Sequence, residues 1–175
     1  MTSLSSGEMA PSPLVAAPLL RRLGAVLYEA LLILALVLVT GFVLLPITPG
    51  AGAHALYIPR PAARAISFAV IVLVVGGYCV HFWTAGRRTL PMKTWHVALL
   101  RRDGTALDRR TALVRYAAGW IGPALAIAAY VALRDAGHAR QGFWLLAFNF
   151  LYALVDREQL FLHDRIAGTR IVRSG

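Results

Sequence analysis

The sequence predicts an all-α membrane protein: a bundle of four transmembrane helices, alternatively three, with a basic cytoplasmic loop. Composition is the first observation that favours this class. Hydrophobic residues make up 58% of the 175 residues and charged residues only 15%, whereas a typical soluble domain is about 25% charged. The second observation is that the apolar residues gather in long runs, and roughly 20 helical residues cross a bilayer core about 30 Å thick.

The first span is expected at residues 23–45, where Glu29 is the one charged residue. The small residues at 51–53 resemble a signal-peptide cleavage site, but the apolar run is far longer than the about 7 to 15 residues of a signal core. The run is therefore interpreted as a retained span. Residues 1–18 before it are rich in Ser, Pro and small residues, which is typical of a disordered tail.

Three further apolar runs follow. Residues 65–83 contain no Asp, Glu, Lys or Arg and end in aromatic residues, as spans do at the membrane surface. Residues 116–133 contain Gly122-Pro123, which predicts a kink whose freed carbonyl is satisfied by a neighbouring helix. Residues 142–155 number only 14, too few to span as an ordinary α-helix.

The distribution of Lys and Arg decides between three and four spans. With four spans, 14 of these residues lie on the inner face and 4 on the outer face, whereas three spans give 10 against 8. Because cytoplasmic loops carry the excess of positive charge, four spans with both termini cytoplasmic are favoured. The membrane domain then covers residues 19–172, with a short tail at 173–175.

The inner loop carries most of the polar sequence. Asp103-Gly104 predicts a turn of a small hairpin, and Asp108 is placed to cap the helix that enters the membrane at Tyr116. Basic residues near an anionic inner leaflet contribute about 1 kcal/mol each. The expected lipid contacts are Arg87, Arg88, Lys93, Arg101, Arg102, Arg109, Arg110 and Arg115.

Several classes of function are disfavoured. The net charge of +10 would suit nucleic acid in a soluble protein, but the basic residues follow the ends of apolar runs, so no nucleic-acid partner is expected. The single cysteine, Cys79, lies in an apolar run, and the five histidines stand at no ligand spacing. Neither a metal nor a cofactor is predicted.

A polar cluster is expected at the inner face. Arg22 and Glu29 lie seven residues apart on one face of the first helix, offset by roughly 10 Å. An ionisable group in a span is costly and is normally paired. We expect the carboxyl-terminal segment to return to this face, where His163 or Arg165 meets Glu29 while Asp164 meets Arg22.

Three motifs together match a known family. They are Arg22-Leu23 with Glu29, Phe82-Trp83-Thr84 with Thr89-Leu90 and Met92, and His163-Asp164-Arg165 with Gly168-Thr169-Arg170. On these residues the chain resembles the RDD family of small multi-pass bacterial membrane proteins, named for one arginine and two aspartates. The sequence departs from the family pattern at Glu29, an aspartate there, at Arg87-Arg88 and at Pro91. The resemblance implies a bacterial cytoplasmic (inner) membrane location and leaves the activity largely unassigned, with cation and proton transport proposed for some members.

Two functions are weighed. The favoured one is a non-catalytic membrane accessory or scaffold protein, in which the polar cluster locks the carboxyl-terminal segment onto the bundle. The alternative is a cation or proton transporter or antiporter in which Glu29 titrates, and four short spans would then need a homo-oligomer to enclose an ion path. An enzyme is not expected, because adjacent His163 and Asp164 point about 100° apart on a helix and no nucleophile motif accompanies them.

Overall fold

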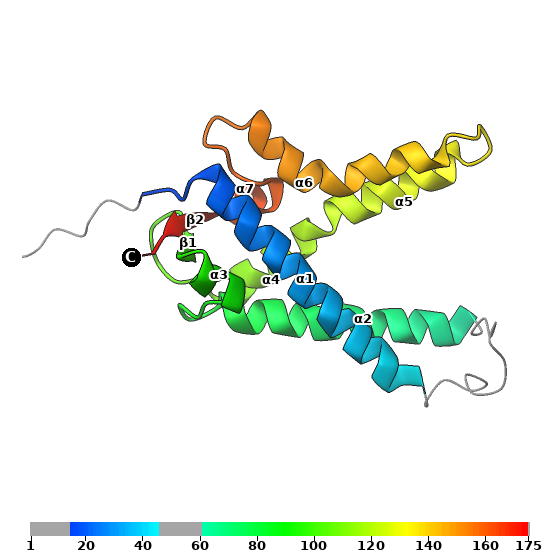
Figure 1. Cartoon of the computed structure of the whole chain (residues 1–175), viewed down its shortest axis with the longest axis horizontal. Helices are drawn as coiled ribbons and strands as arrows, with labels where there is room; N and C mark the ends of the chain where they lie inside the picture. The colour runs from blue at the N-terminus through cyan, green and yellow to red at the C-terminus, as the bar shows by residue number, and fades with distance from the viewer. Residues whose placement is uncertain (1–14, 46–60, 175) are drawn as a thin grey trace, which may run out of the picture.

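The computed structural model describes residues 15–45 and 61–174. Long helices extend from one end of the molecule, where short helices and a two-stranded sheet gather (Figure 1). The elements are the α-helices α1 (Leu19–Leu44), α2 (Pro61–Trp83), α3 (Leu90–Thr94), α4 (Arg109–Gly119), α5 (Ile121–Leu133), α6 (Phe148–Leu151) and α7 (Leu162–Ala167), the 3-10 helices η2 (Ala139–Ala147) and η3 (Tyr152–Leu154), and the strands β1 (Val97–Arg101) and β2 (Thr169–Arg173).

Three segments of the described chain are long and apolar enough to cross a membrane: α1, α2, and α4 with α5 over Arg109–Leu133. The three long runs were therefore located correctly. Each helix nevertheless begins four to seven residues before its expected span. The reason is that a helix continues from the bilayer into the polar surface layer, where charged residues are tolerated. Each of the three extensions contains arginine.

The kink predicted in the third span is present. The helix breaks at Trp120, between α4 and α5. Pro123 has no backbone N–H, so the carbonyl of Gly119 loses its partner within the helix. The side-chain amide of Asn149, on α6, donates a hydrogen bond of 2.8 Å to that oxygen. A neighbouring segment thus satisfies the freed carbonyl, as membrane helices require.

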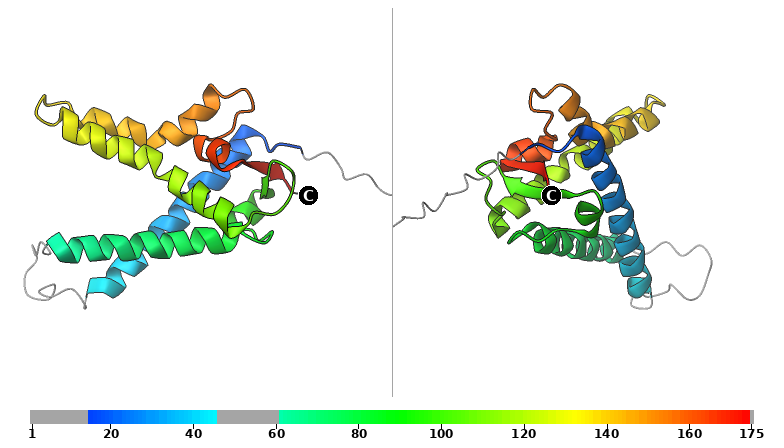
Figure 2. Two further views of the ribbon diagram at one scale, coloured as in Figure 1. Left: turned by 180° about the vertical axis from the view of Figure 1, so that it is seen from behind. Right: turned by 60° about the vertical axis from the view of Figure 1, so that its left-hand side comes forward.

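The fourth apolar run forms no single α-helix. Residues 139–154, here called the return segment, wind as η2, α6 and η3 and pack antiparallel along α5 (Figure 2). Small residues permit this close approach. A Cβ added at Gly122 would lie 2.9 Å from the carbonyl oxygen of Leu146, and one added at Gly142 would lie 3.0 Å from the backbone nitrogen of Tyr130. Backbone contact through glycine is a common way to hold helices together in lipid.

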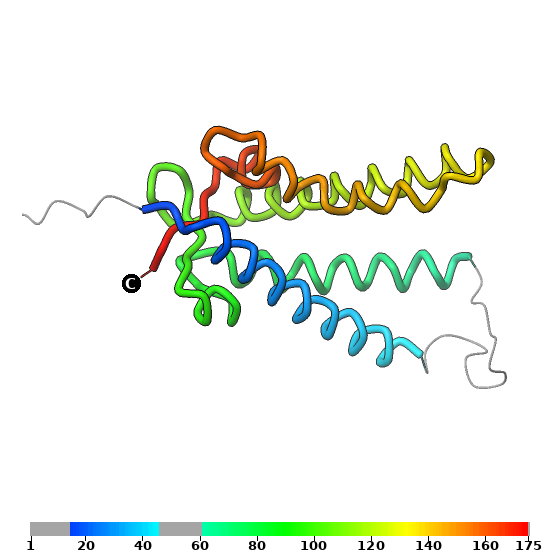
Figure 3. The backbone as a smooth tube through the Cα atoms, turned by 45° about the horizontal axis from the view of Figure 1, so that its top comes forward, coloured from blue at the N-terminus to red at the C-terminus, as the bar shows by residue number. Residues whose placement is uncertain are grey.

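The polar segments form one module, here called the cap, at residues 15–18, 84–108 and 160–174. Strand β1 pairs antiparallel with β2, from Val97 opposite Arg173 to Arg101 opposite Thr169. Residues 15–17 join β2, since Ala17 N–H donates to the Ile171 carbonyl over 3.1 Å. The segments before α1, between α2 and α4, and after α7 therefore meet at one end of the molecule (Figure 3).

Two local expectations for the inner loop have different outcomes. Asp108 caps α4 as predicted, accepting a hydrogen bond of 2.8 Å from the Thr111 N–H. The hairpin prediction was wrong in its partner. The turn at 103–104 exists, with Gly104 N–H donating to the Arg101 carbonyl, but β1 pairs with β2, some 70 residues away in the sequence.

Residues 15–17, 173 and 174 were predicted to belong to the two tails, but they are part of the cap. Residues 1–14 and 175 lie outside the described residues. Residues 15–17 contact β2, and Ala17 is fully buried, so the boundary at residue 18 lies inside the cap. Arg173 belongs to β2, and Ser174 donates its N–H to the His96 carbonyl.

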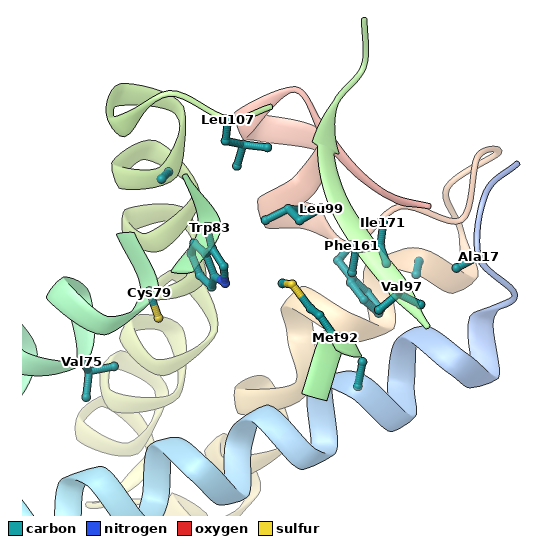
Figure 4. Packing of buried hydrophobic residues seen from close by; sticks show 13 residues of the cluster. Ala17, Val75, Cys79, Trp83, Met92, Val97, Leu99, Leu107, Phe161 and Ile171 are labelled. Atoms are coloured by element: carbon teal, nitrogen blue, oxygen red, sulfur yellow. The ribbon is translucent and has the colours of Figure 1, made fainter. Parts of the chain in front are cut away.

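The hydrophobic core lies where the cap meets the helices (Figure 4). Phe161 and Val97 are completely buried, and Trp83 and Met92 nearly so. These side chains come from α2, α3, β1 and the segment before α7, so the core joins the cap to the bundle. By contrast, large apolar side chains on the outer faces of α1, α2 and α5 are exposed, as expected for surfaces that face lipid.

Replacing Gly122 by alanine should lower the stability of the protein, because the new Cβ would collide with backbone atoms of the return segment. We expect a loss of about 1 to 3 kcal/mol, the usual cost of overpacking, measured by thermal unfolding in detergent. Gly77→Ala is the matched control, since a Cβ there meets no atom within 4 Å. Equal unfolding temperatures for the two variants would contradict the proposed contact.

Candidate functional site

The centre of the polar region is a buried ion pair between α4 and α7. Arg115 Nε donates to Asp164 Oδ1 over 2.8 Å, and the two side chains are only 6% and 1% exposed. The guanidinium carbon of Arg115 also lies 4.3 Å from the centre of the Trp83 ring, so a cation–π contact holds the charge on a second side. Three separate elements, α2, α4 and α7, are therefore joined at one arginine.

Asp164 has further partners within its own segment. Thr169 Oγ1, itself fully buried, donates to Asp164 Oδ1 over 2.8 Å. Gly168 makes this contact feasible because it ends α7 in the left-handed conformation, at φ +65°. Burial alone would raise the pKa of Asp164, but Arg115, His163 and the hydrogen bonds from Arg115 and Thr169 together lower it. The residue is a buried, stably ionised carboxylate.

His163 lies beside this pair. Its Nε2 is 3.2 Å from Arg115 Nη2, and because a guanidinium only donates, this nitrogen must accept. A neutral ring then carries its proton on Nδ1, which is buried and has no hydrogen-bond partner among the described residues. Burial lowers the pKa of His163 to about 4, with Arg115 adding to the effect and Asp164 opposing it. The ring stacks on Phe161, with centroids 5.6 Å apart.

Arg22, on the first turn of α1, is buried near the same group. Its Nη1 donates to the carbonyl of Gln159 over 2.7 Å, and its guanidinium lies over the ring of Phe161 at 5.9 Å. It interacts electrostatically with Asp164, but no ion pair within 4.0 Å forms between them. Arg22 therefore ties α1 to the segment before α7 through a backbone carbonyl.

Glu29 has a different environment from the one expected. Its Oε2 accepts a hydrogen bond of 2.6 Å from Thr89, the N-cap residue of α3. The Tyr78 hydroxyl lies within electrostatic reach, yet Oε1 is buried and has no hydrogen-bond partner in the described part of the chain. None of the ion pairs that the described residues form includes Glu29.

The predicted polar cluster is therefore only partly assembled. Arg22, His163 and Asp164 come together, but Glu29 binds Thr89. The expected contact of Arg165 was wrong: its side chain is 43% exposed and lies 3.5 Å from Asp156 and 3.6 Å from Glu158. On α7 it points away from the bundle, because its neighbours His163 and Asp164 occupy the buried face.

Arg115 was assigned to lipid contact, and this prediction was wrong. Its position at the end of an apolar run suggested a role at the membrane surface, but the side chain is buried against Asp164. A sequence signal for burial was available. Ala112 and Ala118 flank it at three-residue spacing and are also buried, so Arg115 lies on a small-residue face that admits a close neighbour.

The other seven basic residues of the loop lie on the cap or, for Arg109 and Arg110, on the first turn of α4 beside it. Lys93, Arg109 and Arg110 are exposed. Others have protein partners: Arg87 donates to the His81 carbonyl at the end of α2, over 2.6 Å, and Arg88 donates to Ser174. Further contacts of this surface are the pairs of Arg101 with Asp103 and Asp108 and of Arg102 with Glu158.

A cavity of about 280 Å³ lies beneath the cap, bounded by α1, α2, α4, α5 and α6. Its wall is mainly apolar, but Glu29, Arg115, Asn149 and His163 all contribute to it. No group of three or more His, Cys, Asp or Glu residues that could hold a metal ion occurs within residues 15–45 and 61–174. The chemistry that this arrangement offers is charge pairing and hydrogen bonding in an apolar setting.

Membrane-length helices joined to a polar cap by a buried ion pair define a helical, multi-pass type of membrane protein. The chain belongs to the RDD family, whose model matches residues 16–168. Neither a curated protein nor a solved structure matches the chain. The structure brings the first two motifs of the family resemblance into contact, since Thr89 binds Glu29. The third motif is held together internally, since Thr169 binds Asp164.

Replacing Asp164 by asparagine should strongly destabilise the protein, because Arg115 would remain buried without a counter-charge. Breaking a buried pair in this way costs about 3 to 5 kcal/mol. Glu158→Gln is the matched control, since its side chain is 59% exposed and a surface pair is worth about 1 kcal/mol or less. Thermal unfolding in detergent compares them, and similar losses for both variants would refute a central role for Asp164.

The stability should also fall on acidification. The pKa of His163 is about 4 in the folded protein and about 6.5 in an unfolded chain, so the unfolded chain binds more protons between these values. The stabilisation that comes from burying neutral His163 is therefore fully present above pH 6.5. It is lost as the pH falls from 6.5 to 4. Unfolding temperatures between pH 7 and 4 measure it. His163→Gln should flatten this dependence, whereas His138→Gln, at an exposed residue, should leave it unchanged.

Proposed function

We propose that this protein is a non-catalytic accessory or scaffold protein of the bacterial inner membrane. The Arg115–Asp164 pair is the observation that carries the proposal. It joins α4 to α7 at a fully buried position, and its atoms are occupied by one another, by Thr169 and by His163. Charged groups whose atoms are all bound by protein partners stabilise the fold. Such a role suits a scaffold protein, whose cap presents a fixed surface to partner molecules.

The proposed topology has four crossings with both termini cytoplasmic. Two features support it. Residues 15–17 and β2 lie side by side, so the chain between them crosses the membrane an even number of times. The return segment is also longer than its residue count suggests, because 3-10 turns rise about 2.0 Å per residue and α-helical turns about 1.5 Å. Twelve 3-10 residues and four α-helical ones extend over about 30 Å, the thickness of a bilayer core.

Anionic lipids of the inner leaflet are the proposed partners of the cap surface. The support comes from the exposed positions of Lys93, Arg109 and Arg110, which have no acidic partner within 4.0 Å among the described residues. Free basic side chains near a membrane surface attract anionic headgroups. Arg115 is excluded from the proposed lipid contacts because it is buried against Asp164.

The transporter alternative gains no support from the geometry. Glu29 lies near the cap, about three turns into α1. Beyond it, residues 31–44 of α1 contain no ionisable side chain. The far halves of α2 and α5 offer only Arg64 and Tyr130, so the described spans hold no chain of titratable groups leading to the far side.

The proposal is tested by measuring flux and stability on the same variants. We expect wild-type protein in sealed proteoliposomes to give no proton-coupled sodium or potassium flux above protein-free vesicles. Asp164→Asn should lower the unfolding temperature without creating or removing any flux. A flux in the wild type that Glu29→Gln abolishes would overturn the scaffold proposal and establish transport.

A further inference from the structure

The cavity beneath the cap is the strongest candidate for an unassigned binding site. Its volume of about 280 Å³ exceeds the about 150 Å³ that admits benzene in an engineered apolar cavity. Three helices contribute equivalent stretches to its wall: α1 from Ala25 to Ile33, α2 from Val75 to Trp83, and the α4–α5 segment from Arg115 to Pro123. Each stretch rises about 12 Å, so the cavity is elongated along the bundle.

The wall is polar at one end and apolar at the other. Arg115 and His163 lie at the cap end, and Glu29 and Asn149 lie further along. Asn149 is level with Gly119, to which it is hydrogen-bonded. Beyond them, the wall consists of apolar residues on α1, α2 and α5, the segments that face lipid. The residues at this end are Ile33, Val75, Trp120 and Pro123.

Two hydrogen-bond acceptors on this wall have no partner among the described residues. Oε1 of Glu29 and Oδ1 of Asn149 are both buried and unpaired, and Asn149 as a whole is only 2% exposed. Leaving a buried polar atom unpaired costs about 1 to 3 kcal/mol. A bound molecule that donates hydrogen bonds would remove this cost.

The charge of Glu29 also lacks a counter-charge. Arg115, the cation on the same wall, is engaged by Asp164 and by the face of Trp83. Arg22 is engaged by the Gln159 carbonyl and Phe161. The remaining neighbours of Glu29 are hydroxyls, from Thr89 and Tyr78. An apolar cavity that holds one carboxylate without a cation favours a cationic guest.

The aromatic residues of the wall suit the same guest. Tyr116 and Trp120 line the cavity on successive turns, with ring centroids 6.2 Å apart and planes at 89°. Phe150 lines the wall from α6. Faces of aromatic rings attract cations, more strongly where water is excluded.

We propose that this cavity binds a primary alkylammonium amphiphile taken from the bilayer. Its ammonium group donates to Glu29, with Asn149 as a second acceptor on the wall, and its alkyl chain extends between α2 and α5. These helices diverge from the cap (Figure 2), so the apolar end of the cavity faces the membrane interior. The site is separate from the scaffold role, because Asp164 does not line the cavity and the proposed guest binds Glu29 and Asn149.

The test uses the full chain in phosphatidylcholine nanodiscs, titrated with octylammonium chloride by calorimetry against empty nanodiscs. We expect saturable binding of one molecule per chain. Octan-1-ol has the same alkyl chain without the charge. Its affinity should be lower than that of octylammonium by about tenfold or more. Equal affinity for the two probes would overturn the proposal in favour of a neutral guest, and a lack of saturable binding would reject the site itself.

Three variants make the test specific. Glu29→Gln should weaken octylammonium binding by about tenfold or more, because the charge-assisted hydrogen bond is lost. Glu158→Gln removes an exposed acid outside the cavity and should bind as the wild type does. Ala30→Phe places a bulky group at a lining residue that is exposed, so it should block both probes without unfolding the protein.

Unfolding temperatures measured on the same samples show that each variant is folded. Unchanged octylammonium affinity in folded Glu29→Gln would contradict the assigned role of the carboxylate. The outcome is independent of the flux experiment, because binding can be lost while the scaffold and its stability persist.

Discussion

The structure depends on one desolvated charge, the guanidinium of Arg115. A buried cation requires a full set of partners. The partners of Arg115 come from two distant parts of the chain: Trp83 at the end of α2, and the adjacent residues His163 and Asp164 on α7. Once this group is fixed, the position of β2 against β1 follows, because Thr169 both binds Asp164 and begins the strand. The cap is therefore held to the helices by electrostatics as well as by its small apolar core.

Local features of the fold could be predicted from the sequence, and contacts between distant segments could not. Hydropathy located three spans because burial in lipid depends on each segment alone. The Asp108 cap and the kink at Pro123 are likewise decided within a few residues. The pairing of β1 with β2 was missed because two short strands 68 residues apart carry no signal of their partnership. The return segment was judged by its residue count, and its 3-10 winding is not encoded by any simple periodicity.

The candidate site shows the same division. Glu29 was recognised because a carboxylate in an apolar run is costly wherever its partner lies. Asp164 was recognised because it belongs to a polar segment that was expected to return to the first helix. Their partners were misassigned because charge complementarity alone paired acids with the most obvious bases. The observed partner of Glu29 is the uncharged hydroxyl of Thr89, and that of Asp164 is an arginine that resembled a surface anchor. The neutral hydroxyl of Thr89 and the small-residue face around Arg115 were the features of the sequence that indicated the observed partners.

The arrangement of β2 has a consequence for biogenesis. The ribosome makes α1, α2, α4, α5 and the return segment before it makes β2, the strand that closes the cap. Until then Arg115 has no Asp164, and the amino-terminal residues 15–17 have no strand to join. The cap can therefore be completed only after the last segment, α7 with β2, has been translated. A chain interrupted shortly before residue 164 would leave Arg115 without its counter-charge, so an incomplete chain would lack the contact that joins the cap to the helices.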